Sequence, residues 1–254
     1  MTDHILEAKN LGIDFGGLTA VNNLNLYIDQ KEIVGLIGPN GAGKTTVFNL
    51  FTKVYKPTRG NIYLCGEDIS KFSTMDASIA GIARTFQNIR LFSNLSVLDN
   101  VKAAMNNSHD YSIIDTLIHS KKFRENETEI DEKACELLKI FDLFDLKDIK
   151  ASSLPYGAQR RLEIARALAS NPKVLLLDEP AAGMNPQETE DLMKTIRFVR
   201  DKFDICIMLI EHDMNLVMNI CERIYVLNYG MLLAKGSPDE IKNDQNVIKA
   251  YLGE

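Results

Sequence analysis

The chain has 254 residues, enough for one large domain or two small ones around a sizeable core. Its 29 Lys and Arg stand against 35 Asp and Glu, which gives a net charge of −6. This acidic balance argues against a broad nucleic-acid footprint, because such a surface needs a basic face. The chain has no apolar run near the length of about 18 residues that a membrane span needs, and no secretion signal starts it, so we expect a cytosolic protein.

The N-terminal part predicts two strands. Residues 5–11 and 24–28 alternate apolar and polar side chains, and Phe15-Gly16-Gly17 supplies a turn between them. Phe15 is a candidate platform for stacking a nucleotide base, while an equally open interpretation makes it one more aromatic residue of the core.

A glycine-rich stretch follows the apolar, β-branched run 33–37, which predicts a strand. Residues 38–45 contain two glycines separated by four residues and followed by Lys44 and Thr45. Glycines allow the positive φ that turns successive N–H groups toward an anion, and a helix beginning near Lys44 adds the positive end of its dipole. An ordinary glycine turn is the alternative, but the flanking strand and helix favour a phosphate-binding loop. In such a loop Lys44 reaches the β- and γ-phosphates and the Thr45 hydroxyl ligates Mg²⁺.

The middle of the chain has a different character. Residues 61–64 and 81–87 predict short strands, but valine and isoleucine then become rarer. Apolar residues over 130–141 recur at helical spacing, with Glu, Asp and Lys opposite them. We therefore expect a helical insertion over about residues 88–157, with a loop at the polar stretch 106–110.

Strands alternate with helices in the last part of the chain. A helix is expected from about Ala158 to before Pro172, and another over residues 187–202. Between them, residues 174–177 are a continuous apolar run of the kind buried in a parallel sheet, as are residues 205–210. Ser237 and Pro238 begin a C-terminal helical extension over about 237–254. The alternation predicts an α/β fold with a mainly parallel sheet.

Acidic residues end the two apolar strands of this last part. Asp178 and Glu179 follow the first strand, and Glu211-His212-Asp213 follows the second. Buried carboxylates need a cation or a hydrogen-bonding partner, and parallel strands deliver their carboxyl ends to the edge that carries the phosphate loop. We expect Asp178 to hold Mg²⁺ through water and Glu179 to orient or deprotonate the attacking water.

At this point the chain resembles the ATP-binding subunits of ABC transporters, nearly from end to end and in family order. The matching pieces are Phe15, residues 38–46, Gln87, the run Leu154-Pro155-Tyr156-Gly157-Ala158-Gln159 at the signature motif, Asp178-Glu179, and His212. The long separation between Lys44 and Asp178 leaves room for the helical insertion of that family, and the chain has no guanine-reading Asn-Lys-x-Asp motif. The resemblance implies one cassette over residues 1–254, with a P-loop NTPase core, an N-terminal antiparallel β subdomain and a helical insertion.

The resemblance also implies an ATPase that uses ATP and Mg²⁺, with roles for residues that match the family motifs. Glu179, His212 and Gln87 are the implied catalytic residues, with His212 on the γ-phosphate and Gln87 near Mg²⁺ or the attacking water. The implied Mg²⁺ ligands are Thr45, Gln87 and Asp178. The implied ATP contacts are Phe15, Gly38, Pro39, Asn40, Gly41, Ala42, Gly43, Lys44, Thr45, Thr46, Tyr156 and Gly157.

Family architecture sets the expected partners. Two such subunits, identical or related, dimerise head to tail, so that the signature loop of one closes over ATP held by the other. The dimer sits on the inner face of the cell membrane through two membrane-spanning permease subunits, and an external substrate-binding protein acts indirectly. No nucleic acid is expected.

Two positions depart from the family pattern. Pro155 stands at the signature serine, so a hydroxyl and a backbone N–H are missing there. Asn185 stands where the loop after Glu179 usually carries Asp. We expect both to affect how this chain serves the site of its partner, and not its own phosphate loop.

Four stretches resemble the subunit of branched-chain amino acid importers in particular. They are residues 84–92, 155–166, 181–186 and 210–214. The alternatives are the ATPase of another ABC transporter, such as one for lipopolysaccharide, and a soluble ABC-type ATPase acting on nucleic acid or ribosomes. The acidic balance and the single cassette weigh against the last of these.

Overall fold

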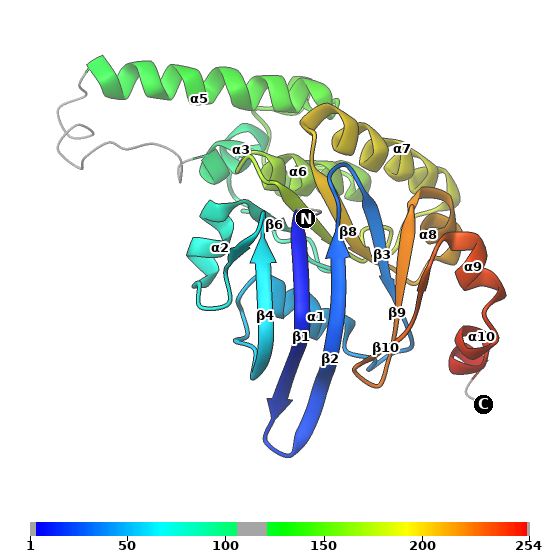
Figure 1. Ribbon diagram of the computed structural model, residues 1–254. Coiled ribbons are helices and arrows are strands. Elements are labelled where there is room, and N and C mark those ends of the chain that lie inside the picture. The colour runs from blue at the N-terminus through cyan, green and yellow to red at the C-terminus, as the bar shows by residue number, and fades with distance from the viewer. Residues whose placement is uncertain (1–3, 106–120, 253–254) are drawn as a thin grey trace. The chain divides into compact units, whose positions relative to one another are not determined.

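The computed structural model describes residues 4–105 and 121–252, which form two compact units. The first unit combines Met1–Gln87 with Lys173–Glu254, and the second is Asn88–Pro172. The chain therefore leaves the first unit after Gln87 and returns to it at Lys173. Figure 1 shows the elements of both.

An antiparallel sheet with strand order β2-β1-β4-β5 opens the first unit. Its strands are β1 (Leu6–Phe15), β2 (Leu18–Ile28), β4 (Arg59–Leu64) and β5 (Glu67–Asp68). β1 and β2 form a hairpin whose register shifts three times, first between Ala8 and Leu11. Such bulges interrupt the alternation of apolar and polar residues, which is why the strands predicted over 5–11 and 24–28 are too short.

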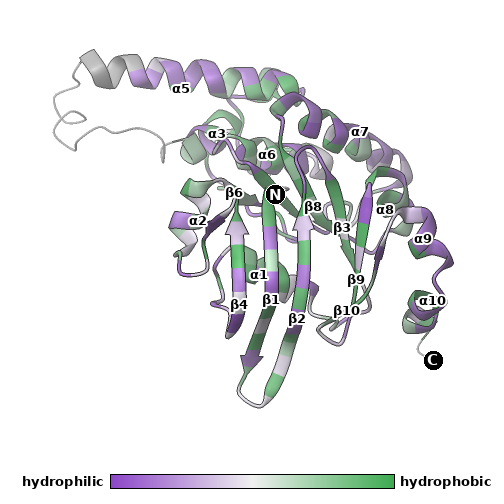
Figure 2. Ribbon diagram, viewed as in Figure 1, coloured by the Kyte–Doolittle hydropathy of each residue, from purple (hydrophilic) through white to green (hydrophobic). Residues whose placement is uncertain are grey.

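A six-stranded sheet with order β10-β9-β3-β8-β7-β6 forms the core of the first unit. All its neighbours pair in parallel except β10 and β9. Its strands are β3 (Ile33–Ile37), β6 (Ile82–Arg84), β7 (Val174–Asp178), β8 (Cys206–Ile210), β9 (Arg223–Asn228) and β10 (Met231–Gly236). β3, β7 and β8 are buried at every residue, and β3 and β8 are coloured as hydrophobic strands in Figure 2.

The register of this sheet positions the site. Ile210 in β8 pairs with both Leu36 in β3 and Asp178 in β7. The residues that follow these three strands therefore share one edge of the sheet. This mainly parallel sheet, the N-terminal antiparallel sheet and the helical second unit confirm the fold class expected from the sequence.

Six helices accompany the sheets in the described part of the first unit. They are α1 (Lys44–Phe51), α2 (Thr74–Ala80), α7 (Pro186–Phe203), α8 (Met214–Ile220), α9 (Pro238–Asn243) and α10 (Gln245–Leu252). α9 begins as predicted, with the Ser237 side chain accepting from Glu240 N–H. In residues 4–105 and 121–252 we find no helix with both the length and the hydrophobicity to cross a membrane.

The second unit is helical. Its elements are α3 (Val97–Met105), α5 (Lys121–Ile140), the 3₁₀ turns η2 (Phe144–Leu146) and η3 (Ala151–Ser153), and α6 (Tyr156–Leu168). α6 packs against α3 and α5, so this unit continues to Pro172 and does not end near residue 157. α6 also begins before Ala158, because Gln159 N–H already bonds to the Pro155 carbonyl at 3.0 Å. The loop expected over 106–110 lies outside the described residues.

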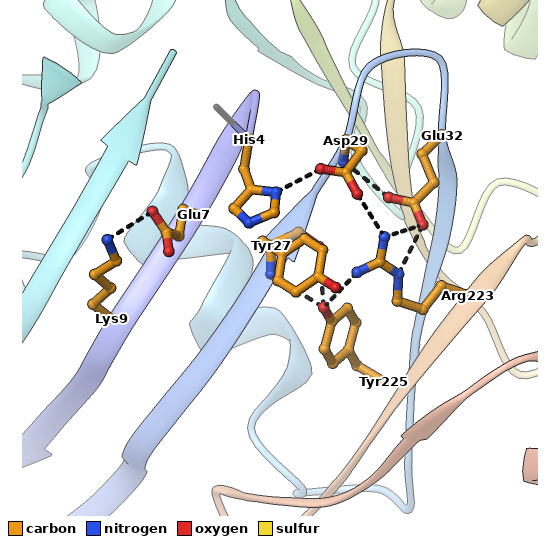
Figure 3. A network of polar contacts seen from close by, with 8 residues as sticks. All are labelled: His4, Glu7, Lys9, Tyr27, Asp29, Glu32, Arg223 and Tyr225. Atoms are coloured by element: carbon orange, nitrogen blue, oxygen red, sulfur yellow. Dashed lines mark hydrogen bonds and ion pairs between the residues drawn. The ribbon is translucent and has the colours of Figure 1, made fainter. Parts of the chain in front are cut away.

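A polar network joins the antiparallel sheet to β9 in the first unit (Figure 3). Arg223 donates to Glu32 Oε1 through Nε at 2.8 Å and to Asp29 Oδ2 through Nη2 at 2.9 Å. Its guanidinium lies 4.0 Å from the centre of the Tyr27 ring. The buried Tyr225 hydroxyl accepts from Tyr27 N–H at 3.2 Å and donates to the Tyr27 carbonyl at 3.1 Å. Burial lowers the pKa of Arg223, but the hydrogen bonds to Asp29 and Glu32 raise it by more, so the net shift of the pKa is upward.

Candidate nucleotide-binding site

An open pocket of about 390 Å³ lies at the N-terminus of α1. The start of β2, the glycine-rich loop, the residues after β7 and β8, and the β9–β10 turn line it. These residues are Leu18, Thr19, Ala20, Asn40, Gly41, Ala42, Gly43, Lys44, Thr45, Thr46, Glu179, His212, Tyr229 and Gly230. All belong to the first unit.

The glycines of the loop hold a backbone that other residues would not adopt. Gly38, Gly41 and Gly43 have φ values of 148°, 78° and 101°. A Cβ on Gly38 would lie 2.1 Å from the Leu227 carbonyl oxygen, and one on Gly43 would lie 2.8 Å from that of Ala20. The loop therefore needs glycine for conformation and for space. It leads into the N-terminus of α1, where free N–H groups and the helix dipole favour an anion.

Lys44 is held against this loop. Its side chain is 6% exposed, and Nζ donates to the carbonyl oxygens of Gly38 at 2.7 Å and Pro39 at 3.0 Å. Burial lowers the pKa of Lys44, while the negative charges of Glu179 and Asp178 raise it. The structure thus places a buried cation between the loop and two carboxylates.

Glu179 is the centre of a polar cluster at the edge of the pocket. Gln87 donates from Nε2 to Glu179 Oε2 at 2.7 Å, and His212 Nε2 lies 3.2 Å from Glu179 Oε1. Glu179 has a left-handed φ of 47°, fixed by its N–H bond of 2.9 Å to the Ile210 carbonyl. A non-glycine residue in this conformation stores strain of about 1–3 kcal/mol, which is common at functional sites. The cluster joins the ends of three strands around one carboxylate.

Asp178 lies beside Glu179 but bonds in another direction. Its side chain is 7% exposed, and Oδ2 accepts from Arg84 Nη2 at 2.6 Å. Arg84 Nη1 donates at 2.7 Å to Oδ1 of Asn49 in α1. Asp178 is therefore paired with a buried cation and does not itself line the pocket.

Glu211 supports the backbone around His212. It is 3% exposed and accepts from the N–H groups of Ala181 at 2.7 Å, His212 at 3.0 Å and Asp213 at 3.3 Å. Burial raises the pKa of Glu211, and the three backbone bonds oppose that shift. No role was predicted for Glu211 beyond its place at the end of a buried strand.

Three predicted residues lie elsewhere. Phe15 is at the end of β1, 43% exposed, with its ring edge-on to Tyr55 at 5.1 Å, and it does not line the pocket. Tyr156 and Gly157 belong to the second unit, in the first turn of α6, where Tyr156 is exposed. Four more predicted residues do not line the pocket themselves: Gly38, Pro39, Gln87 and Asp178. The first three are hydrogen-bonded to a residue that lines it, and Asp178 precedes the lining residue Glu179 in the sequence.

Five lining residues were not predicted: Leu18, Thr19, Ala20, Tyr229 and Gly230. The β9–β10 turn joins the loop because Gly230 N–H bonds to the Ala42 carbonyl at 3.0 Å, and Asn22 N–H bonds to the Gly230 carbonyl at 2.8 Å. The turn sequence Asn228-Tyr229-Gly230 after an apolar run was the available signal for a hairpin.

The arrangement is that of a P-loop nucleotide hydrolase. A glycine loop between a buried parallel strand and a helix offers N–H groups and a lysine to phosphates, and the carboxylate of Glu179, which follows β7, lines the same pocket.

Comparison with known proteins identifies the family. A family model described as ABC transporter matches residues 21–182, and one described as branched-chain amino acid ATP-binding cassette transporter matches residues 231–254. The chain therefore belongs to the ABC transporter family, and the expected family and ATPase class are confirmed.

Relatives match over the full length. The chain is 45% identical over 254 residues, 100% of both chains, to the high-affinity branched-chain amino acid transport ATP-binding protein BraF of Pseudomonas aeruginosa. It is 37% identical over 249 residues, 98% of this chain and 97% of the other, to the lipopolysaccharide export system ATP-binding protein LptB of Escherichia coli. A solved nucleotide-free ATP-binding cassette of an ABC transporter is 32% identical, covers 99% of this chain and 100% of its own, and has a TM-score of 0.85.

Proposed function

We propose that this ATPase powers the import of branched-chain amino acids through a membrane transporter. Similarity along the whole chain supports that substrate class, with 45% identity to the branched-chain transport protein against 37% to the lipopolysaccharide export protein. The match of residues 231–254 to a branched-chain cassette model points the same way. The proposed mechanism of ATP hydrolysis rests on one observation, the placement of Glu179 between Gln87 and His212 beside the phosphate loop.

The proposed roles follow from the positions of the side chains. Lys44 and the N–H groups of residues 40–46 bind the β- and γ-phosphates of ATP. Glu179 accepts a proton from the attacking water, and Gln87 and His212 hold its two oxygens in place. His212 can also donate to the γ-phosphate. The exposed ring of Phe15 offers a platform for the adenine base.

The donor set suits Mg²⁺, which prefers oxygen ligands and keeps several waters. Thr45 supplies a hydroxyl, Gln87 an amide oxygen and Asp178 a carboxylate. Asp178 Oδ2 is bonded to Arg84, so Oδ1 is the oxygen available to a hydrated cation in the described part of the structure. When bound, Mg²⁺ would offset the negative charge of the phosphates.

We infer that the working unit is a dimer of ATP-binding subunits, docked through two permease subunits on the inner face of the membrane. Tyr156 and Gly157 of one subunit would face ATP held by the other. Pro155 caps α6 without a side-chain hydrogen bond and has neither a hydroxyl nor an N–H, so this chain lacks both of the donors that a serine there would offer its partner. An external binding protein would deliver the amino acid.

The test is reconstitution in proteoliposomes with two permease subunits and the external binding protein of a branched-chain amino acid importer. We expect ATP hydrolysis and uptake to rise with leucine, isoleucine or valine, and both to be lost with Glu179→Gln. Stimulation by RNA or ribosomes in place of the permeases would support the soluble ATPase instead. Stimulation by lipopolysaccharide would support the other transporter class.

A further inference from the structure

Arg84 is a buried cation between the two elements that carry the proposed Mg²⁺ ligands. Its side chain is 7% exposed, although it lies only three residues before Gln87. Nothing in the hydrolysis scheme above uses its charge. We propose that Arg84 is a positioning residue that sets the distance between Thr45 on α1 and Asp178 on β7, and thereby the affinity of the site for Mg²⁺. This inference rests on the proposed metal site.

The two branches of the guanidinium reach different elements. Nη2 donates to Asp178 Oδ2 at 2.6 Å, and Nη1 donates to Asn49 Oδ1 at 2.7 Å. Asn49 lies four residues after Thr45 in α1, so the two share one face of that helix. The planar fork of arginine fixes both acceptors relative to each other, which a flexible lysine ammonium cannot do as well.

Aromatic rings hold the guanidinium in its plane. Arg84 Cζ lies 5.5 Å from the centre of the Phe48 ring and 5.1 Å from that of Phe86. Phe48 belongs to α1, and Phe86 follows β6. Desolvated cation–π contacts of this kind restrain both the position and the orientation of the cation. The Arg84 guanidinium therefore contacts α1 twice, at the Phe48 ring and at the Asn49 side chain.

The bond from Arg84 also determines which oxygen of Asp178 is available to the proposed cation. With Oδ2 bonded to Arg84, the carboxylate cannot rotate freely, and Oδ1 keeps one direction toward the proposed cation. Partners that hold a ligating carboxylate typically contribute about 10- to 100-fold in metal affinity. Without Arg84, Asp178 would lose the cation that is hydrogen-bonded to its Oδ2, and its carboxylate would be free to turn away from Thr45.

The metal contribution can be measured without hydrolysis. Titration calorimetry with a non-hydrolysable ATP analogue gives one dissociation constant with Mg²⁺ and another with EDTA, and their ratio reports the gain in affinity from the metal. We expect Arg84→Met to reduce that ratio by about 10- to 100-fold, toward the value of Asp178→Asn. The dissociation constant in EDTA should stay within about threefold, because the phosphate loop is untouched. Arg84→Lys should restore part of the ratio, and Asn49→Ala should lower it less than Arg84→Met.

The outcomes separate this inference from the proposed function. If Asp178→Asn lowers the ratio and Arg84→Met does not, the positioning role is wrong and the metal site stands. If Arg84→Met weakens binding equally in Mg²⁺ and EDTA, Arg84 has only a general structural role, and the inference is again wrong. If Asp178→Asn leaves the ratio unchanged, the proposed metal site is wrong and the role of Arg84 fails with it. Circular dichroism of each variant checks that it has folded.

Discussion

Gln87 donates a hydrogen bond of 2.7 Å to Glu179, although the two residues are 92 positions apart in the chain. Gln87 is the last residue of the first unit before the chain enters the second, and Glu179 follows the buried strand β7. The carboxylate that we propose as the catalytic base is thus bonded to the residue that borders the helical unit. A shift of the backbone at Gln87 would therefore change the hydrogen bond that positions the Glu179 carboxylate.

Removal of the loop cation should weaken nucleotide binding. Lys44→Ala deletes the buried ammonium that we expect on the β- and γ-phosphates, and a charge-assisted hydrogen bond contributes about 1.5–3 kcal/mol. The dissociation constant for ATP should therefore rise at least about tenfold in titration calorimetry. The exposed Lys56→Ala is the control and should leave affinity unchanged. Unchanged affinity in Lys44→Ala would remove this loop from the binding site.

Two glycines of the loop should respond differently to the same added methyl group. At Gly38 a Cβ would collide with the Leu227 carbonyl at 2.1 Å, whereas at Gly41 it meets open space. Gly41→Ala should cost only the left-handed backbone strain, about 1–2 kcal/mol. Gly38→Ala should cost about 1–3 kcal/mol more because β9 must move, and it should also weaken ATP binding. Urea unfolding measures both, and equal losses would contradict the packing described at Gly38.

Lys53 should make stability depend on pH in an unusual direction. It is 5% exposed, Nζ has no hydrogen-bond partner among the described residues, and burial lowers its pKa to about 8. Between about pH 8 and pH 10.4 the unfolded chain binds more protons at this site than the folded protein, so its contribution to stability rises with pH. Below about pH 8 the buried Lys53 amine is protonated in the folded protein, and burial of that charge lowers the free energy of unfolding.

Lys53→Met should remove this penalty. We expect the unfolding free energy at pH 7 to increase by up to about 3 kcal/mol and the site's rise in stability above pH 8 to disappear. Position 53 has a left-handed φ of 59° whether lysine or methionine occupies it, so backbone strain cancels between the wild type and Lys53→Met. Lys56→Met, on the exposed surface, should change stability by less than about 0.5 kcal/mol. Parallel stability curves for wild type and Lys53→Met between pH 7 and pH 10 would contradict the prediction.

Asn185 should act as a helix cap that aspartate can replace. Its side chain accepts from Glu188 N–H at 3.0 Å, and Glu188 accepts from Asn185 N–H at 2.9 Å. Asn185→Ala should cost about 0.5–2 kcal/mol in urea unfolding, and Asn185→Asp, which keeps the accepting oxygen, should cost almost nothing. A large loss in Asn185→Asp would show that this position needs a donor group as well.

The elements that the sequence predicted are those with a local signal. The phosphate loop combines glycine spacing with a strand before it and a helix after it, and β7 and β8 are continuous apolar runs. The ends of these strands then meet because parallel pairing brings them to one edge. On that basis we expected Asp178 and Glu179 near Lys44, and the family resemblance implied His212 there. The structure places Glu179 and His212 in the lining of the same pocket as Lys44.

The remainder of the pocket depends on contacts that no local pattern reveals. β9 pairs with β3 across 189 positions, from Val34 to Arg223, and its hairpin turn then bonds to the loop at Ala42. Gly230 has to be glycine because a Cβ would lie 2.5 Å from the Ala20 carbonyl, a residue of the N-terminal hairpin. Only the folded chain shows that these segments meet.

The most direct test of the account is the ATP hydrolysis rate of Glu179→Gln in the assembled transporter, measured together with ATP affinity. The substitution keeps the shape of the side chain and removes the base, so the rate should fall about 10²- to 10⁴-fold while affinity stays within a few-fold. Glu190→Gln on the exposed face of α7 is the matched control and should hydrolyse ATP at the wild-type rate. Wild-type hydrolysis by Glu179→Gln would contradict the proposed mechanism at its centre.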